Sequence, residues 1–322
     1  MLQTINRQLE KWMPIITPLS VLTGVLLAEK LLAFTFLIPW LFAFMTLTGS
    51  LGSNFSSLKG VIKKPLPLFV IILLLHLVMP SVAWLVGQSF YPDDHLTITG
   101  FVLAAVIPTG ITSFIWVTIY KGNIALALSI ILFDTILSPF LVPFSLSLFV
   151  GQNVQINVLD IMYGLFFMVV IPSLLGMLTN HFTKGKCVKA GKALAPFSKL
   201  ALASVVMING AVISPYITEF NVKLLMIGLT VFFLACIGYI IAWGIGIFLK
   251  RDRETQVVML FTGGMRNISA GAVIAVQYFP PAVAVPVVLG MLFQQILASL
   301  FGFLFQLFDQ KQVVKDQISA TQ

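Results

Sequence analysis

The residues with the clearest chemical potential lie in the middle of a long apolar segment, 257–278. There Gly263 and Gly264 are followed closely by Arg266 and Asn267. Two successive glycines weaken a helix, and a charge at the centre of a bilayer costs about 2.5 to 3.5 kcal/mol, so neither is expected without a use. The pattern is typical of a broken membrane helix, in which each half-helix offers unpaired backbone groups and a dipole end to a solute.

A second interruption lies in the apolar segment 97–120. Pro108 removes a backbone donor there, and Gly110 supplies flexibility. Backbone donors that follow a helix break are suited to binding an anion. The residues expected to bind a substrate at the two breaks are Gly110, Ile111, Thr112, Ser113, Gly264, Arg266 and Asn267.

The composition indicates an all-α integral membrane protein. Of the 322 residues, 59% are hydrophobic and 9% are charged, and the mean hydropathy is +1.03, which is not compatible with a large soluble domain. The apolar runs fit membrane helices of about 20 residues better than the alternating strands of a barrel. Because Cys187 and Cys236 are the only cysteines, we expect no disulfide, no metal site and no cofactor.

The apolar runs predict ten membrane spans. They lie near 14–29, 32–50, 67–89, 97–120, 122–150, 157–181, 196–216, 222–249, 255–277 and 281–308. If the N-terminus is cytoplasmic, the basic residues outside the spans lie on the cytoplasmic side except Lys30 and Lys223, as the positive-inside rule requires. We therefore expect a protein of the cell membrane with both termini cytoplasmic and no cleavable signal peptide. This topology accounts for the pI of about 9.5, so nucleic acid is not an expected partner.

The ten spans divide into two halves of five, 1–150 and 151–309, followed by a cytoplasmic tail, 310–322. An odd number of spans in each half gives the halves opposite orientations in the membrane. The two interrupted spans are the fourth of each half, so the breaks occupy corresponding places. This pattern predicts an inverted repeat in which two discontinuous helices cross near the midplane of the bilayer.

Sequence motifs in both halves carry a family resemblance. They lie in 108–113, 120–129 and 137–139, and again in 264–269 and 282–286. These segments resemble the P-G-G-T-x-S-N, K/R-G-N/D-x-A-L-S, S-P and E-x-G-M-Q-N-S motifs of the bile acid:sodium symporter family. The resemblance implies a core domain of spans 3–5 and 8–10, a panel domain of spans 1, 2, 6 and 7, and alternating-access transport of small organic anions. The family's substrates include bile acids, sulfated steroids and pantoate-like or 2-oxo acids.

The chain departs from this family at the positions that the resemblance assigns to sodium ligands. Those positions carry Leu75, Phe114, Ala127, Ile131, Thr262 and Arg266. Sodium needs several hard oxygen ligands, preferably one of them anionic, and will not bind beside a fixed guanidinium. We therefore expect a transporter that is not coupled to sodium, and a sodium-coupled symporter with a non-standard ion site is an alternative.

Three ionisable side chains lie at bilayer depth. Arg266 and Asp134 fall near the middle of their spans in the inferred core domain, where they can pair. One interpretation is a purely structural ion pair. In a second, Arg266 faces the cavity and binds a substrate carboxylate while Asp134 accepts a coupling proton; in a third, the two line separate water-filled clefts. His76 either titrates near neutral pH in a coupling role or is hydrogen-bonded to a neighbouring helix.

A secondary active carrier agrees best with two matched breaks. A channel would need polar or small residues along several spans, and a membrane enzyme would need a cluster of His, Asp or Ser residues; neither pattern is seen. An arsenite-type metalloid exporter of a related fold is the alternative carrier, but it would need a cysteine near span 4, whereas Cys236 lies in span 8. The expected partners are a small organic anion and the lipid bilayer, and we expect a monomer.

Overall fold

The computed structural model describes residues 2–53, 65–152, 154–218 and 221–320. Every regular element in these ranges is helical, and eight helices are long and apolar enough to cross a membrane. Two further apolar helices are shorter, with 10–17 residues: Ile15–Leu26 and His95–Val106. The second is short because its span is interrupted after Val106. Each of the ten predicted spans thus falls on helix, and eight helices have the full length.

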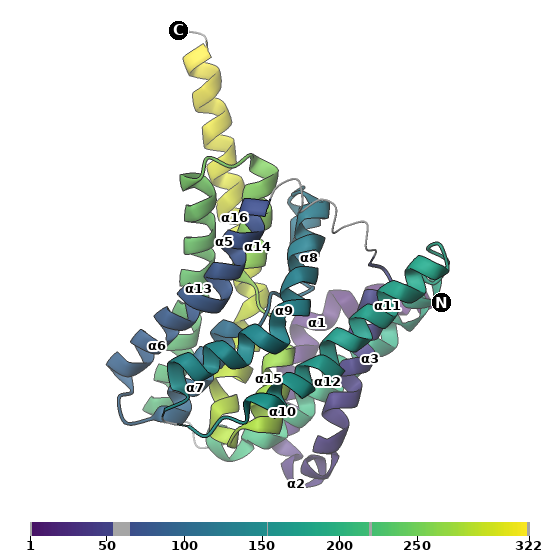
Figure 1. Cartoon of the computed structure of the whole chain (residues 1–322), viewed down its shortest axis with the longest axis vertical. Coiled ribbons are helices and arrows are strands. Elements are labelled where there is room, and N and C mark those ends of the chain that lie inside the picture. The colour runs from purple at the N-terminus through teal and green to yellow at the C-terminus, as the bar shows by residue number, and fades with distance from the viewer. Residues whose placement is uncertain (1, 54–64, 153, 219–220, 321–322) are drawn as a thin grey trace.

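The helices have the following bounds (Figure 1). They are α1 (Leu2–Leu26), α2 (Ala28–Leu31), η1 (Leu32–Leu37), α3 (Ile38–Ser50), α5 (Pro65–Leu73), η3 (Leu74–Val78), α6 (Met79–Phe90), α7 (His95–Val106), α8 (Ser113–Ile119), α9 (Ile124–Val150), α10 (Val158–Leu165), η4 (Phe166–Val170), α11 (Ile171–Phe182), α12 (Val188–Ile217), α13 (Val222–Phe248), α14 (Arg253–Gly264), α15 (Ile268–Tyr278) and α16 (Pro281–Ala320).

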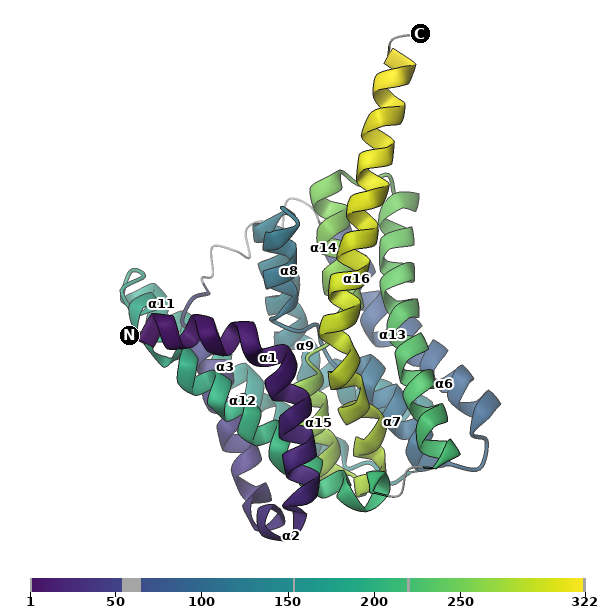
Figure 2. The same ribbon diagram turned by 180° about the vertical axis from the view of Figure 1, so that it is seen from behind.

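Two groups of helices lie side by side in the bundle. In one group α1 and α3 pack with α12, and α11 packs with α3. In the other α7 and α13 pack with α16, α6 packs with α7, and α14 packs with α13. The helix α15 contacts members of both groups, α3 and α12 on one side and α7 and α16 on the other. The view from behind shows α16 projecting beyond the other helices, so the predicted tail, 310–322, continues this helix as far as Ala320 (Figure 2).

The chain leaves helical geometry at two points inside apolar segments. The helix α7 ends at Val106 and α8 begins at Ser113, with Pro108 between them. In the second half α14 ends at Gly264 and α15 begins at Ile268. Both interruptions lie in the fourth predicted span of their half of the chain.

The second break begins after the two glycines that mark it in the sequence, which corrects the expected position. Gly263 and Gly264 are the last residues of α14, and extended backbone begins at Met265, with φ −99° and ψ 143°. A Cβ on Gly264 would lie 2.2 Å from the ring of Tyr239 and one on Gly263 would lie 2.6 Å from Ala242. The glycines are therefore required because α13 packs closely against α14.

His76 lies in a π-helical turn, η3, just before Pro80 at the start of α6. Proline has no backbone N–H, so the carbonyl four residues earlier, that of His76, loses its usual helical donor. The hydroxyl of Ser145 on α9 donates to this carbonyl instead, at 2.8 Å. This contact fixes η3 against α9.

Candidate functional site

The two helix breaks contact each other through their backbones. The N–H of Asn267 donates to the carbonyl of Pro108 at 2.8 Å. A Cβ on Gly110 would lie only 2.8 Å from the carbonyl oxygen of Arg266, so this close approach requires a glycine. Residues 110 and 266, which the sequence places in one site, are therefore neighbours in the fold.

Arg266 binds backbone carbonyls at both breaks. Its side chain is buried, with 6% of its surface exposed. Nε donates to the carbonyl of Ala105 at 2.9 Å, and Nη1 donates to that of Gly263 at 2.7 Å and more weakly to Met265 at 3.4 Å. Nη2 has no hydrogen-bond partner in the part of the chain that the structure describes.

The breaks explain why these carbonyls accept from a side chain. In an unbroken helix Ala105 would accept from the N–H of Thr109, and Gly263 would accept from that of Asn267. Those two amides are engaged elsewhere, at Asp134 and at Pro108. A cation at the carbonyl end of a helix is also favoured by the helix dipole. One guanidinium thus satisfies groups that both interruptions leave open.

Asp134 pairs with His76 and not with Arg266, which corrects the predicted Arg266–Asp134 contact. His76 Nε2 lies 2.6 Å from Asp134 Oδ1, and the N–H of Thr109 donates to Oδ2, also at 2.6 Å. Asp134 has no exposed surface and His76 is 6% exposed. The physical reason is that the backbone groups freed by the breaks supply nearer partners: carbonyls for the guanidinium and an amide for the carboxylate.

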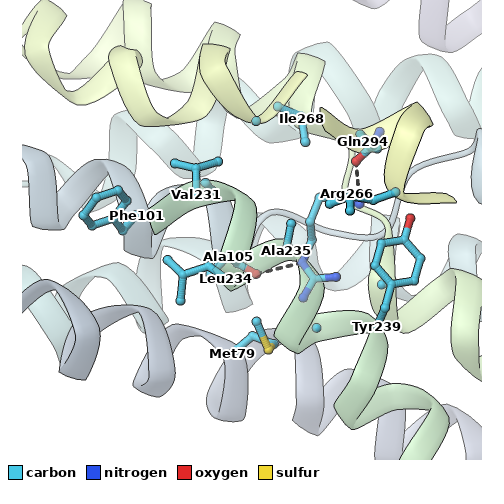
Figure 3. Close-up of a pocket in the computed structure, with 15 residues that line it drawn as sticks. Met79, Phe101, Ala105, Val231, Leu234, Ala235, Tyr239, Arg266, Ile268 and Gln294 are labelled. Carbon is cyan, nitrogen blue, oxygen red and sulfur yellow. Dashed lines mark hydrogen bonds between the residues drawn. The ribbon is translucent and has the colours of Figure 1, made fainter. Parts of the chain in front are cut away.

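A small pocket lies beside the guanidinium (Figure 3). It has a volume of about 60 Å³ and is mostly apolar, with Met79, Phe101 and Leu234 among its lining residues. Its polar groups come from Arg266 and from Gln294, whose side-chain oxygen accepts from the N–H of Arg266 at 3.0 Å. This volume has room for water molecules but not for an organic anion of ordinary size.

A larger cavity, of about 200 Å³, lies between α3, α9, α11 and the first break. Ile111 from the break and Phe114 from α8 line it, together with Ile131 and Thr135 of α9. Neither Gly264 nor Arg266 lines this cavity; both line the small pocket. Of the predicted substrate residues, Ile111 therefore lines one cavity, and Gly264 and Arg266 line another.

The remaining predicted site residues are hydroxyl and amide groups at the ends of the half-helices. Asn267 caps α15, where its side chain accepts from the N–H of Ala270. Ser113 begins α8 and is fully buried, and its hydroxyl has no partner among the described residues. The hydroxyl of Thr109 is likewise buried without a partner. Thr112 precedes α8 without a side-chain cap.

Sequence reasoning missed the roles of Gln294 and of Pro80. Gln294 and Gln295 form a polar pair inside an apolar span, which is a visible signal, and Gln295 accepts from the indole N–H of Trp116. Pro80, four residues after His76, signals a freed carbonyl. No feature of the sequence alone indicates that His76 rather than Arg266 contacts Asp134.

Comparison with known proteins shows the family to which the chain belongs. The model of the Sodium Bile acid symporter family matches residues 38–220. The uncharacterized protein YbaS of Bacillus subtilis (strain 168) is 52% identical over 304 residues, 94% of this chain and 99% of that protein. The uncharacterized sodium-dependent transporter YocS of the same organism is 25% identical over 71% of this chain and 70% of its own length. The probable sodium/metabolite cotransporter BASS1, chloroplastic, of Arabidopsis thaliana is 26% identical over 80% of this chain and 63% of its own length. The chain belongs to the Sodium Bile acid symporter family, and it is a multi-pass membrane transporter rather than an enzyme.

Proposed function

We propose that this protein carries small organic anions, of the bile-acid, pantoate or 2-oxo acid type, across the cell membrane by alternating access and without sodium. In this proposal the chain has ten spans in two inverted repeats, 1–150 and 151–309, with both termini cytoplasmic. The interruption of the fourth predicted span in each half supports the repeat. The two packed groups of helices support a division into a core and a panel domain.

One observation carries the proposal: the guanidinium of Arg266 lies on the carbonyls of both breaks. These carbonyls would be natural ligands for a cation, and a fixed cation already occupies them. Two positive charges about 4 Å apart repel by about 4 kcal/mol at an effective dielectric constant of 20, which corresponds to about a thousandfold loss of affinity. A sodium ion at the same place would be excluded.

The same guanidinium supports an anionic substrate. Nη2 has no partner among the described residues and the small pocket lies beside it, so an anion oxygen can bond there without displacing the contacts to Ala105 and Gly263. The start of α15, which follows Asn267, is next to it, and the first turn of that helix offers backbone donors. The small pocket takes only the anionic group, so in this proposal the site widens during alternating access to take the organic part of the substrate.

Transport by the purified protein tests the proposal. Proteoliposomes are offered labelled taurocholate, pantoate and 2-oxoisovalerate, first with sodium and then with choline at the same pH. We expect at least one anion to be transported, at an initial rate that does not change when choline replaces sodium. A steep dependence on sodium would refute the sodium-independent function.

A sodium-coupled symporter with a different ion site is the second candidate. The observation in its favour is the group of oxygens at the first break. There the Asp134 carboxylate accepts from the N–H of Thr109, and the hydroxyls of Thr109 and Ser113 have no partner among the described residues. In that case Asp134→Asn should abolish the sodium dependence. A metalloid exporter has less support, because neither cavity is lined by Cys187 or Cys236.

A further inference from the structure

We propose that transport is coupled to protons and that the coupling proton is carried by the buried pair of His76 and Asp134. This inference rests on the proposed function as an organic anion carrier and names its coupling ion. The pair is formed by residues 58 positions apart, with Nε2 and Oδ1 at 2.6 Å. Such a contact requires a hydrogen between the two atoms, so the pair always holds one proton.

A second proton has a defined place to bind. His76 Nδ1 is buried and has no hydrogen-bond partner in the described part of the chain. An unpartnered acceptor in the interior is unfavourable, and an imidazole can take up a second proton at such a nitrogen. When Nδ1 is bare the pair has a charge of −1, and when it is protonated the pair is neutral.

The charges around the pair favour this exchange. The helices packed against η3 are α5, α6, α7 and α9, and apart from Asp134 the only titratable side chain that they carry is His95, at the start of α7. From α14 and its break the nearby charge is Arg266, which is in electrostatic range of Asp134, and α13 adds the neutral groups Cys236 and Tyr239.

Charge balance then predicts the stoichiometry. Without substrate, Arg266 and Asp134 cancel in a region of low dielectric constant. A monovalent anion bound at Arg266 leaves one negative charge, and an uncompensated buried charge costs several kcal/mol. Protonation of His76 restores neutrality. One proton should therefore accompany one monovalent anion, and no net charge crosses the membrane.

Both ligands act on the same interrupted turn, 105–109. The anion binds the guanidinium that holds the carbonyl of Ala105, and the proton binds the imidazole that is paired with the carboxylate holding the N–H of Thr109. A hydrogen bond to an ionised group is about twice as strong as one between neutral groups, and a charge that is shared with a second partner holds this turn less strongly. The geometry thus links both binding events to the first break.

Accumulation driven by a pH gradient tests the proposal. The full-length protein is reconstituted in sodium-free liposomes and offered labelled taurocholate, pantoate and 2-oxoisovalerate, with protein-free liposomes as the control for passive entry. An acidic medium should drive accumulation of the transported anion, up to about tenfold for each unit of pH gradient, because one pH unit corresponds to about 1.4 kcal/mol per proton. An imposed potassium diffusion potential should not change this accumulation.

Three variants locate the proton. Asp134→Asn keeps an oxygen for the N–H of Thr109 and an amide donor for His76, but it does not titrate at these pH values. It should retain exchange of labelled for unlabelled anion at equal pH and lose accumulation driven by the pH gradient. His76→Gln should behave in the same way. The matched control is Ser145→Ala, which removes the contact to the carbonyl of His76 without removing a titratable group, and it should retain both activities.

The outcomes separate this inference from the proposed function. Exchange by the wild type without any response to the pH gradient, or accumulation by Asp134→Asn equal to that of the wild type, would overturn proton coupling and leave anion transport intact. If no probe is exchanged, the proposed function fails for these anions, and infrared difference spectra of the protein decide the proton site. The wild type should then show an imidazole protonation signal on acidification that His76→Gln lacks. Identical spectra would refute the assignment.

Discussion

Replacement of Arg266 by alanine should destabilise the protein even when no substrate is present. The change removes the donors to two buried carbonyls, those of Ala105 and Gly263, whose usual helical partners are engaged elsewhere. Each acceptor left unsatisfied costs about 1–3 kcal/mol, so the total is about 2 to 6 kcal/mol. The lower part of this range is expected, because the pocket of about 60 Å³ can admit water to the vacated space.

Thermal unfolding of the purified protein in detergent, followed by tryptophan fluorescence, measures this effect. Arg266→Lys should recover only part of the lost stability, since an ammonium group cannot reproduce the planar arrangement of Nε and Nη1. The double variant Arg266→Ala with Asp134→Ala is the decisive control. Removal of Asp134 relieves the buried charge that Arg266 balances, but the carbonyls of Ala105 and Gly263 still lack donors, so the double variant should regain only part of the lost stability.

Full recovery of the wild-type stability in the double variant would refute this reasoning, because it would mean that the stranded charge accounts for the whole loss and the two carbonyls need no donor. Anion binding by calorimetry adds a second readout in the variants that remain folded. If Nη2 binds the substrate, Arg266→Lys should bind the transported anion at least tenfold more weakly, which is the loss expected from about 1.4 kcal/mol.

Two further predictions concern packing and pH. Gly264→Ala should lower the melting temperature, because its Cβ would lie 2.2 Å from the ring of Tyr239. The control Gly244→Ala, which has nothing within 4 Å of its Cβ, should have an unchanged or higher melting temperature. Equal melting temperatures for the two variants would contradict the packing argument. Burial alone would raise the pKa of Asp94, but the ammonium of Lys223 and hydrogen bonds at the start of α7 lower it. A carboxylate with a lowered pKa stabilises the fold above its unfolded pKa of about 3.9, and this contribution is lost as the pH falls through the folded pKa. Asp94→Asn should therefore reduce the stability by less than about 1 kcal/mol at neutral pH, because the pair of Asp94 and Lys223 is partly exposed to solvent. The difference in stability from the wild type should shrink below about pH 4. A difference that grows on acidification would contradict a lowered pKa for Asp94.

The sequence predicts the helices of this fold well because length and hydropathy determine them. The ten predicted spans all overlap helices, eight of which are long and apolar enough to cross a membrane in the described part of the chain, and Pro108 correctly places an interruption, since a proline cannot supply the missing donor. The two glycines of α14 indicate a break less directly. The two glycines allow α13 to pack closely against α14, and the first residue with extended backbone is Met265.

The contacts within the candidate site were harder to predict. Hydropathy places Arg266 and Asp134 at similar depths and charge suggests that they pair, but it does not reveal which backbone groups the breaks leave open. Those backbone groups determine which hydrogen-bond partners Arg266 and Asp134 have. The orientation of His76 depends on the π-helical turn before Pro80, and a periodicity of 3.6 residues does not show that turn.

The contact between Arg266 and Ala105 joins positions 161 residues apart, and this has a consequence for biogenesis. When α7 and α8 enter the membrane, the residue that satisfies the end of α7 has not yet been synthesised. A bare carbonyl is not tolerated in lipid, so this region must stay in contact with water or with the insertion machinery until residue 266 arrives. The first half of the chain is therefore an assembly intermediate rather than an independent folding unit. Two halves expressed as separate polypeptides should accumulate only when they are produced together.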